Sequence, residues 1–225
     1  FKNYYNTHEL YLESLKISSD SQAVAVLVQA DQSVFKNVKF TSYHDTLYAQ
    51  VGRQYYENCY IEGRTDYIFG YNATAYFENC DIFSIGAGVT EKNGGYVVAT
   101  KGYSSGAGQD DVTYGYIFNN CRVKCLEGQD AINSNRNNPI TKCCLGRPWR
   151  PYAYTLFMNC ELGGHIVAAG WNNWGNKENE KTARYMEYNN YGKGAAIEGR
   201  AAWAKQLTKK EASAITLEAV FGGDI

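Results

Sequence analysis

The sequence predicts an all-β solenoid, and two observations carry this prediction. A six-residue pattern of aromatic, any, Asn, Cys or Val, any, and apolar residue recurs from Phe35, Tyr56, Phe77, Phe118 and Phe157. Short alternating apolar runs, 22 Gly and only three Pro are typical of many short strands joined by turns. The first repeat starts are 21 residues apart, a period too short for a helix pair but typical of one coil of a parallel β-solenoid.

The later repeat starts follow after 41 and 39 residues, close to twice the first spacing. Each long gap therefore holds either a degenerate copy or a longer loop. Equivalent residues of neighbouring coils stack about 4.8 Å apart, which predicts ladders of aromatic and cysteine side chains inside and of asparagines at turns. We expect the cysteines of this pattern to be core residues with free thiols, namely Cys59, Cys80, Cys121 and Cys160.

The C-terminal segment lacks the repeat. Residues 201–225 are rich in helix formers, and Thr208 with Glu211 has the spacing of a capping box. A chain of 225 residues is long enough for one substantial core. We expect a single domain over 1–225, with coils in 1–200 and a loop and short helix in 201–225 packed along the solenoid.

Composition excludes several classes of function. Lys and Arg total 22 against 23 Asp and Glu, so no basic field indicates nucleic-acid binding. No run of 18 apolar residues predicts a membrane span. The seven Cys and three His do not follow zinc-ligand spacing, and we expect neither a metal nor a cofactor. The 20 Tyr, nine Phe and four Trp suit sheet packing or carbohydrate stacking.

The repeat brings two carboxylates together. Asp45 and Asp66 each lie 11 residues before the aromatic residue of a repeat, so they should face each other on adjacent coils. Two such charges raise the pKa of one group and divide the pair into an acid and a nucleophile or base. Arg147 and Gln22 lie 10 and 13 residues before their repeats, where they can orient a carboxylate and offer an amide. Singly, each residue also suits a structural role; their shared register favours a polysaccharide-processing site.

Several blocks together resemble the pectin methylesterase family. They are "YHDTLYAQ", "GRTDYIFG" and "LGRPW", together with "SQAVAVLV", "AGWNNWG" and the closing "EASAITLEAVFGG". They occur in the family's order over essentially the whole chain, while the family's N-terminal coils are missing from the match. The resemblance implies a right-handed parallel β-helix, in agreement with the repeat.

The resemblance also implies the reaction, hydrolysis of C6 methyl esters in pectin with release of methanol. Asp66 would be the nucleophile, and Asp45 the acid and then the base. Arg147 would keep Asp66 ionised, and Gln22 would donate to the oxyanion. The family has a second oxyanion glutamine where this chain has His44, whose donor capacity and charge change with pH. Neighbours in a strand point to opposite faces unless a turn intervenes, so His44 and Asp45 are not expected to form a pair.

Further expectations follow from the same resemblance. Tyr48, Phe69, Trp149 and Trp171 would line the groove and stack on sugar faces. The partner would be methylated pectin, bound by a secreted monomer without metal or cofactor, and a proteinaceous inhibitor is a further expected partner. The sequon at Asn72 is weak support for secretion.

Two other readings stay open. Another pectin-acting β-helix enzyme, a lyase or a polygalacturonase, would need a calcium cluster or additional aspartates that the register does not supply. A β-helix that binds pectin without catalysis is the third, because of His44 and the missing opening coils.

Overall fold

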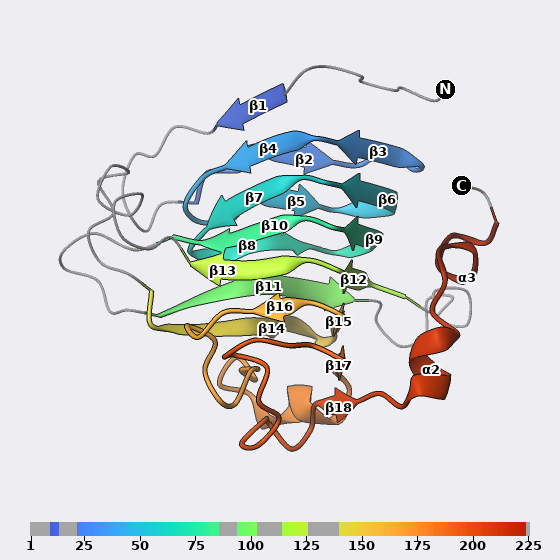
Figure 1. Cartoon of the computed structure of the whole chain (residues 1–225). Helices are drawn as coiled ribbons and strands as arrows, with labels where there is room; N and C mark the ends of the chain where they lie inside the picture. Colours follow the sequence, from blue (N-terminus) through green and yellow to red (C-terminus); the bar gives the residue numbers. More distant parts are fainter. Residues whose placement is uncertain (1–9, 14–21, 86–93, 103–113, 126–139, 224–225) are drawn as a thin grey trace.

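Every strand pairing among the described residues of the computed structural model is parallel, and successive strands wind around one axis as stacked coils (Figure 1). The structure describes residues 10–13, 22–85, 94–102, 114–125 and 140–223. The fold is a right-handed parallel β-helix, as predicted. Within the described residues, no helix has the length and apolar character needed to cross a membrane.

Each complete coil contributes one strand to each of three sheets. The six-stranded sheet contains β1 (Leu10–Glu13), β4 (Val38–Thr41), β7 (Tyr60–Gly63), β10 (Asp81–Ser84), β13 (Arg122–Cys125) and β16 (Glu161–Leu162). The five-stranded sheet contains β2 (Val26–Val28), β5 (Leu47–Ala49), β8 (Thr65–Gly70), β11 (Gly94–Gly102) and β14 (Lys142–Tyr152). The seven-stranded sheet contains β3 (Ser33–Lys36), β6 (Val51–Glu57), β9 (Asn72–Glu78), β12 (Tyr116–Asn119), β15 (Tyr154–Met158), β17 (Arg184–Tyr188) and β18 (Lys205–Gln206).

The sequence repeat corresponds to a continuous ladder of stacked rings in the seven-stranded sheet. Phe77 pairs directly with Phe118, and Phe118 with Phe157, so each long gap is one longer coil rather than two coils with a degenerate copy. The rings of both pairs stack with centroids 4.4 Å apart. The longer-loop alternative is therefore the correct one.

The other two ladders follow from the same register. The repeat cysteines are buried and free, and their thiols donate to backbone carbonyls, as Cys160 does to Met158 at 3.2 Å. The repeat asparagines adopt left-handed backbone conformations, with φ between 52° and 57°, which Asn tolerates better than most residues. Further along the same stack, Asn189 donates to Asn159 at 2.8 Å. The predicted core cysteines with free thiols are confirmed.

The described part of the chain contains three short helices, one before β17 and two after β18. They are η2 (Lys177–Lys181), α2 (Lys209–Ser213) and α3 (Leu217–Phe221). The predicted capping box is present: Thr208 accepts from the backbone of Glu211, whose side chain accepts from the backbone of Thr208. Val220 and Phe221 of α3 pack against the outer face of the seven-stranded sheet at Tyr76.

A small polar cluster lies inside the solenoid. Tyr67 and His165 are both buried, and each contacts the hydroxyl of Ser84, at 3.0 and 3.2 Å. Burial lowers the pKa of His165 to about 4, so the imidazole is neutral at neutral pH. His165 is therefore a structural residue, as is Tyr67.

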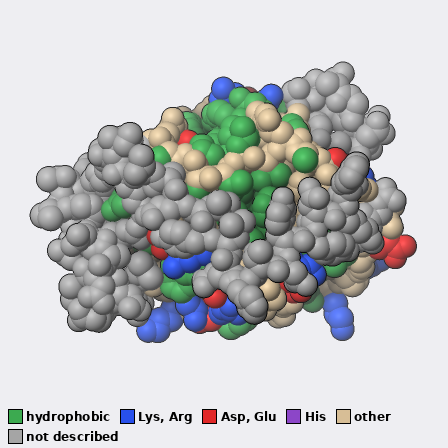
Figure 2. Space-filling view, turned by 90° about the horizontal axis from the view of Figure 1, so that it is seen from above, with side chains coloured by type: hydrophobic (Ala, Val, Ile, Leu, Met, Phe, Trp, Pro, Cys, Tyr) green, Lys and Arg blue, Asp and Glu red, His purple; other side chains and the backbone are tan. Residues whose placement is uncertain are grey.

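Hydrophobic side chains gather on the end of the solenoid seen from above (Figure 2). In Figure 1 this end carries β2 and β3, which are edge strands of their sheets. Val24 and Leu27 belong to this first coil and are 41% and 47% exposed. The solenoid thus presents apolar surface at the end opposite to η2 and β18.

Candidate active site

Asp45 and Asp66 lie at matching bends of two neighbouring coils. His44 bridges to Thr65 and Leu47 pairs with Ile68, so the two aspartates occupy equivalent positions. Their φ angles of 63° and 48° are left-handed, a region where non-glycine residues are uncommon. The predicted register of the two aspartates is thus present in the structure.

A β-bulge produces this bend. On the next coil, Tyr96 pairs with Thr65 and Val98 with Ile68, so one residue of β11 opposes the two residues Asp66 and Tyr67 of β8. An extra residue of this kind bends a strand and redirects a side chain. Tyr67 consequently fills the core while its neighbour Asp66 reaches Arg147 on the outer side of the five-stranded sheet.

Arg147 holds Asp66 in a two-point ion pair. Its Nε donates to Oδ1 at 2.9 Å and its Nη2 to Oδ2 at 2.6 Å. The Asp66 side chain is only 6% exposed. A fork of this kind favours the ionised carboxylate and fixes its orientation.

Asp45 has the opposite electrostatic environment. Burial and then the negative charge of Asp66 raise its pKa to about 7, partly offset by the positive charge of Arg147. A carboxylate paired with a guanidinium and a carboxyl with a pKa raised to about 7 therefore lie side by side. This is the division of roles that an acid and a nucleophile require.

Two aromatic rings enclose the guanidinium of Arg147. Its Cζ lies 3.8 Å from the ring centroid of Tyr96 and 3.7 Å from that of Trp174. Trp174 has a φ of 60°, an outlier for so bulky a residue, and its backbone amide donates to Asn172 at 2.8 Å. Backbone strain of this kind clusters at functional sites. Neither ring was among the predicted site residues; the second Trp of "WNNW" was the one available signal.

The position of Arg147 differs from the predicted one. Through β11 it lies in register with Phe69, three residues beyond Asp66, and on the second coil after that of Asp66. The side chain therefore reaches back across β11 to the carboxylate. The repeat spacing predicted Arg147 at nearly the same coil position as the aspartates. The bulge at Asp66 accounts for part of the difference between this predicted position and the observed one.

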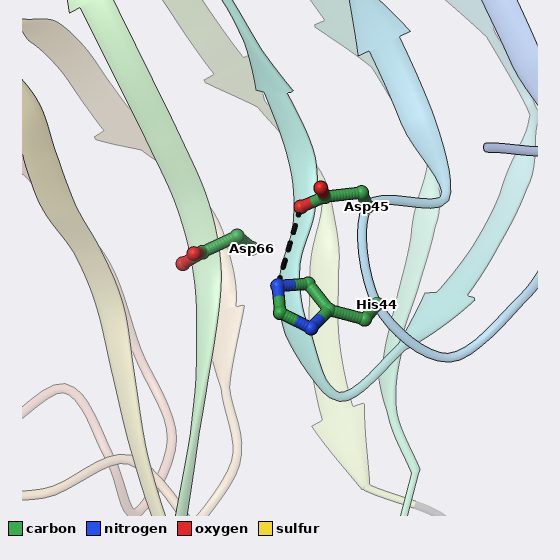
Figure 3. Close-up of side chains that lie close together, drawn as sticks. All are labelled: His44, Asp45 and Asp66. Carbon is green, nitrogen blue, oxygen red and sulfur yellow. Dashed lines mark ion pairs between the residues drawn. The ribbon is translucent and has the colours of Figure 1, made fainter. Parts of the chain in front are cut away.

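His44 and Asp45 do meet, contrary to the expectation for strand neighbours (Figure 3). Nε2 of His44 lies 3.5 Å from Oδ1 of Asp45, because the left-handed conformation of Asp45 turns the two side chains to the same side. Gln22 bridges to His44 one coil earlier and is exposed. The structure thus stacks Gln22 beside His44, one residue before the aspartates' position.

An aromatic platform continues from the carboxylates along the five-stranded sheet. Tyr48 stacks on Phe69 with centroids 4.3 Å apart, and Trp149 stacks on Tyr71 at 5.0 Å. Phe69 and Trp149 meet edge to face at 6.3 Å. Three of the four predicted groove residues are therefore brought together, with Tyr71 as an additional member.

Trp171, the fourth predicted groove residue, is in the core instead. It is 3% exposed, packs 4.5 Å from the ring of Tyr185 and donates its indole N–H to Glu187 at 3.0 Å. The prediction for Trp171 is wrong: this Trp of "WNNW" forms a β-bridge with Gly146, and its ring packs in the core. Trp174, three residues later, is the one that reaches the site.

The fold and the site together define a parallel β-helix protein with a paired-carboxylate site beside an aromatic platform on one outer sheet. The pectinesterase family model matches residues 3–224, and the chain belongs to this family. It is 42% identical over 175 residues to "Probable pectinesterase A" of Neosartorya fischeri, covering 78% of this chain and 47% of that protein. The chain spans about half the length of the curated relatives it matches.

Solved structures agree with this assignment. The pectin methylesterase from carrot has a TM-score of 0.82 and 29% identity, covering 95% of this chain and 64% of that one. A pectin methylesterase in complex with a hexasaccharide has a TM-score of 0.70 and 30% identity, covering 90% of this chain and 61% of that one.

Proposed function

We propose that this chain hydrolyses the C6 methyl esters of galacturonosyl units in pectin, releasing methanol and leaving a free carboxylate. The observation that carries the proposal is the pairing of an Arg147-bound carboxylate, Asp66, with Asp45, whose pKa is raised to about 7. Membership of the pectinesterase family supports the same reaction.

Asp66 would act as the nucleophile. One of its oxygens attacks the ester carbonyl carbon, and the carbonyl π electrons move to oxygen to give a tetrahedral oxyanion. The two hydrogen bonds from Arg147 hold the attacking carboxylate in one orientation, so the transition state requires little further loss of side-chain freedom. When the oxyanion collapses, the bond to methoxide breaks and an anhydride with Asp66 remains.

Asp45 would supply and recover the proton. It protonates the departing methoxide, so that methanol leaves, and as a carboxylate it then deprotonates the attacking water. Water adds to the anhydride carbonyl, the bond to Asp66 breaks, and the enzyme returns to its initial protonation state. A pKa of about 7 suits both roles near neutral pH.

Gln22 and His44 would donate to the oxyanion. They are bridged on adjacent coils immediately before the aspartates. The loss of such a donor typically costs about 2.7–4 kcal/mol. The platform of Tyr48, Phe69, Tyr71 and Trp149 would stack on sugar rings along the groove.

The substrate is extracellular, so the proposal includes secretion of the protein and action as a monomer on polymeric pectin. The sequon does not add to it, because Asn72 begins β9 and its side-chain oxygen is buried.

Methanol release from methylated pectin, measured for the wild type and for Asp66→Ala, tests the proposal. Methanol from the wild type alone, with no unsaturated product and no chain cleavage, is expected. Unsaturated products or shortened chains would instead favour a lyase or a polygalacturonase. Equal, background-level release from both proteins would refute esterase activity, and retained binding to pectin would then indicate a binding module.

A further inference from the structure

Three potential metal ligands lie close together at the candidate active site. His44, Asp45 and Asp66 each offer one ligand atom, and these atoms all lie within 4.8 Å of one another (Figure 3). No other group of three or more His, Cys, Asp or Glu side chains comes this close in the part of the chain that the structure describes. The ligands are largely buried, with side-chain exposures of 20% for His44, 10% for Asp45 and 6% for Asp66.

One imidazole nitrogen and two carboxylate oxygens are a donor set that suits first-row transition ions. Zinc bonds such atoms at about 2.0–2.2 Å, so tetrahedral ligands lie roughly 3.3 Å apart. Nε2 of His44 and Oδ1 of Asp45 are already 3.5 Å apart, and the ligand atoms, which lie within 4.8 Å of one another, would have to contract to this spacing. Mg²⁺ and Ca²⁺ prefer six or more oxygens and are poorly served by this set.

Arg147 leaves room for an ion at Asp66. Its two hydrogen bonds use one lone pair on each carboxylate oxygen, whereas a carboxylate offers about four acceptor sites. Two carboxylates against one guanidinium also leave the fully ionised cluster with net negative charge. An ion there would be partly shielded from bulk water by the buried aspartates.

We propose that His44, Asp45 and Asp66 form a binding site for a divalent first-row transition-metal ion, with Zn²⁺ as the reference, and that the bound ion inhibits the enzyme reversibly. The inhibition rests on the proposed function, because the ion occupies the nucleophile and the acid; the binding does not. A glutamine at position 44 would replace the imidazole by an amide oxygen, a much weaker zinc ligand. The site is therefore a property of this chain's histidine.

The test is calorimetric titration of the metal-free chain with Zn²⁺ at one fixed pH near neutrality. One ion per chain is expected, with affinity lowered at least about 10-fold in His44→Gln. A Cys125→Ser/Cys144→Ser double variant, which removes the two partly exposed thiols, and His8→Ala should bind as the wild type does. Asp45→Asn provides a second ligand variant, which should also lose affinity.

Equal affinity in His44→Gln, or loss of binding in a cysteine or His8 control, would overturn the site. Methanol release is then measured with and without Zn²⁺, each protein relative to its own rate. Inhibition of the wild type that is reversed by EDTA and weakened in His44→Gln is expected; binding at this site without inhibition would refute the inhibitory role. If the wild type releases no methanol, the proposed function fails while the calorimetric comparison still decides the metal site.

Discussion

Replacing the proposed acid Asp45 by asparagine should stabilise the fold while it removes activity. Burial and the Asp66 charge raise the pKa of Asp45 from 3.8 to about 7. The native state thus binds a proton that the unfolded chain has released, and this stabilising contribution is lost as pH rises from about 4 through 7. A shift of about three pH units corresponds to about 4 kcal/mol.

Asparagine is nearly isosteric and carries no charge, so at pH 8 Asp45→Asn escapes this penalty. The expected gain in unfolding free energy is about 2–4 kcal/mol, below the full amount because the amide also loses hydration on burial. At pH 4 the wild-type carboxyl is protonated in the native state, and the gain should nearly disappear. His165 contributes equally to both proteins and cancels in the difference.

Urea unfolding followed by tryptophan fluorescence at pH 8 and pH 4 measures this difference. Asp31→Asn is a control of opposite sign, since hydrogen bonds from Arg53 lower the pKa of Asp31 to about 2 and its removal should weaken the fold at pH 8. A gain that is equal at both pH values, or absent at pH 8, would refute the electrostatic reasoning. Full methanol release by Asp45→Asn would refute its role as the acid.

Four further outcomes are expected. Arg147→Lys should lower kcat for methanol release by about 100-fold or more without unfolding the protein, because a lysine cannot form the fork to Asp66; circular dichroism checks the fold. Trp174→Gly should lower kcat/KM about 3- to 30-fold through loss of the stack on Arg147 while stability is kept or raised, since glycine tolerates a φ of 60°; an unchanged kcat/KM would contradict a positioning role. Between pH 6.5 and 4 the unfolded histidine takes up a proton while the buried His165, with its pKa near 4, does not, so the wild type should lose about 3 kcal/mol of unfolding free energy. His165→Gln should not show this loss. If urea titrations give the same dependence of unfolding free energy on pH for both proteins, the explanation is incorrect. His44→Gln should still release methanol with a flatter acid-side pH profile, and a profile identical to that of the wild type would exclude His44 as an oxyanion donor.

The repeat was sufficient to predict the solenoid with its ladders of aromatic, cysteine and asparagine side chains. A side chain on one coil has its equivalent directly above it on the next, so periodicity in the sequence becomes distance in space. The same reasoning brought Asp45 opposite Asp66, because the two coils have the same length. The repeat did not distinguish a degenerate copy from a longer loop in the gap before Phe118, because the pairing of ladder residues is the same whatever the length of the loop between them.

The sequence by itself therefore determined the family, the coil register and the carboxylate pair of this protein. Only the tertiary structure decided which side chains face the site once the register is broken. The left-handed conformation of Asp45 turns His44 toward its carboxylate, and the bulge at Asp66 lets Arg147 reach across β11. Trp171 forms a bridge to Gly146 and is buried, while Trp174 stacks on Arg147. Left-handed residues and bulges redirect side chains without changing the repeat, so a pattern of spacings cannot reveal them.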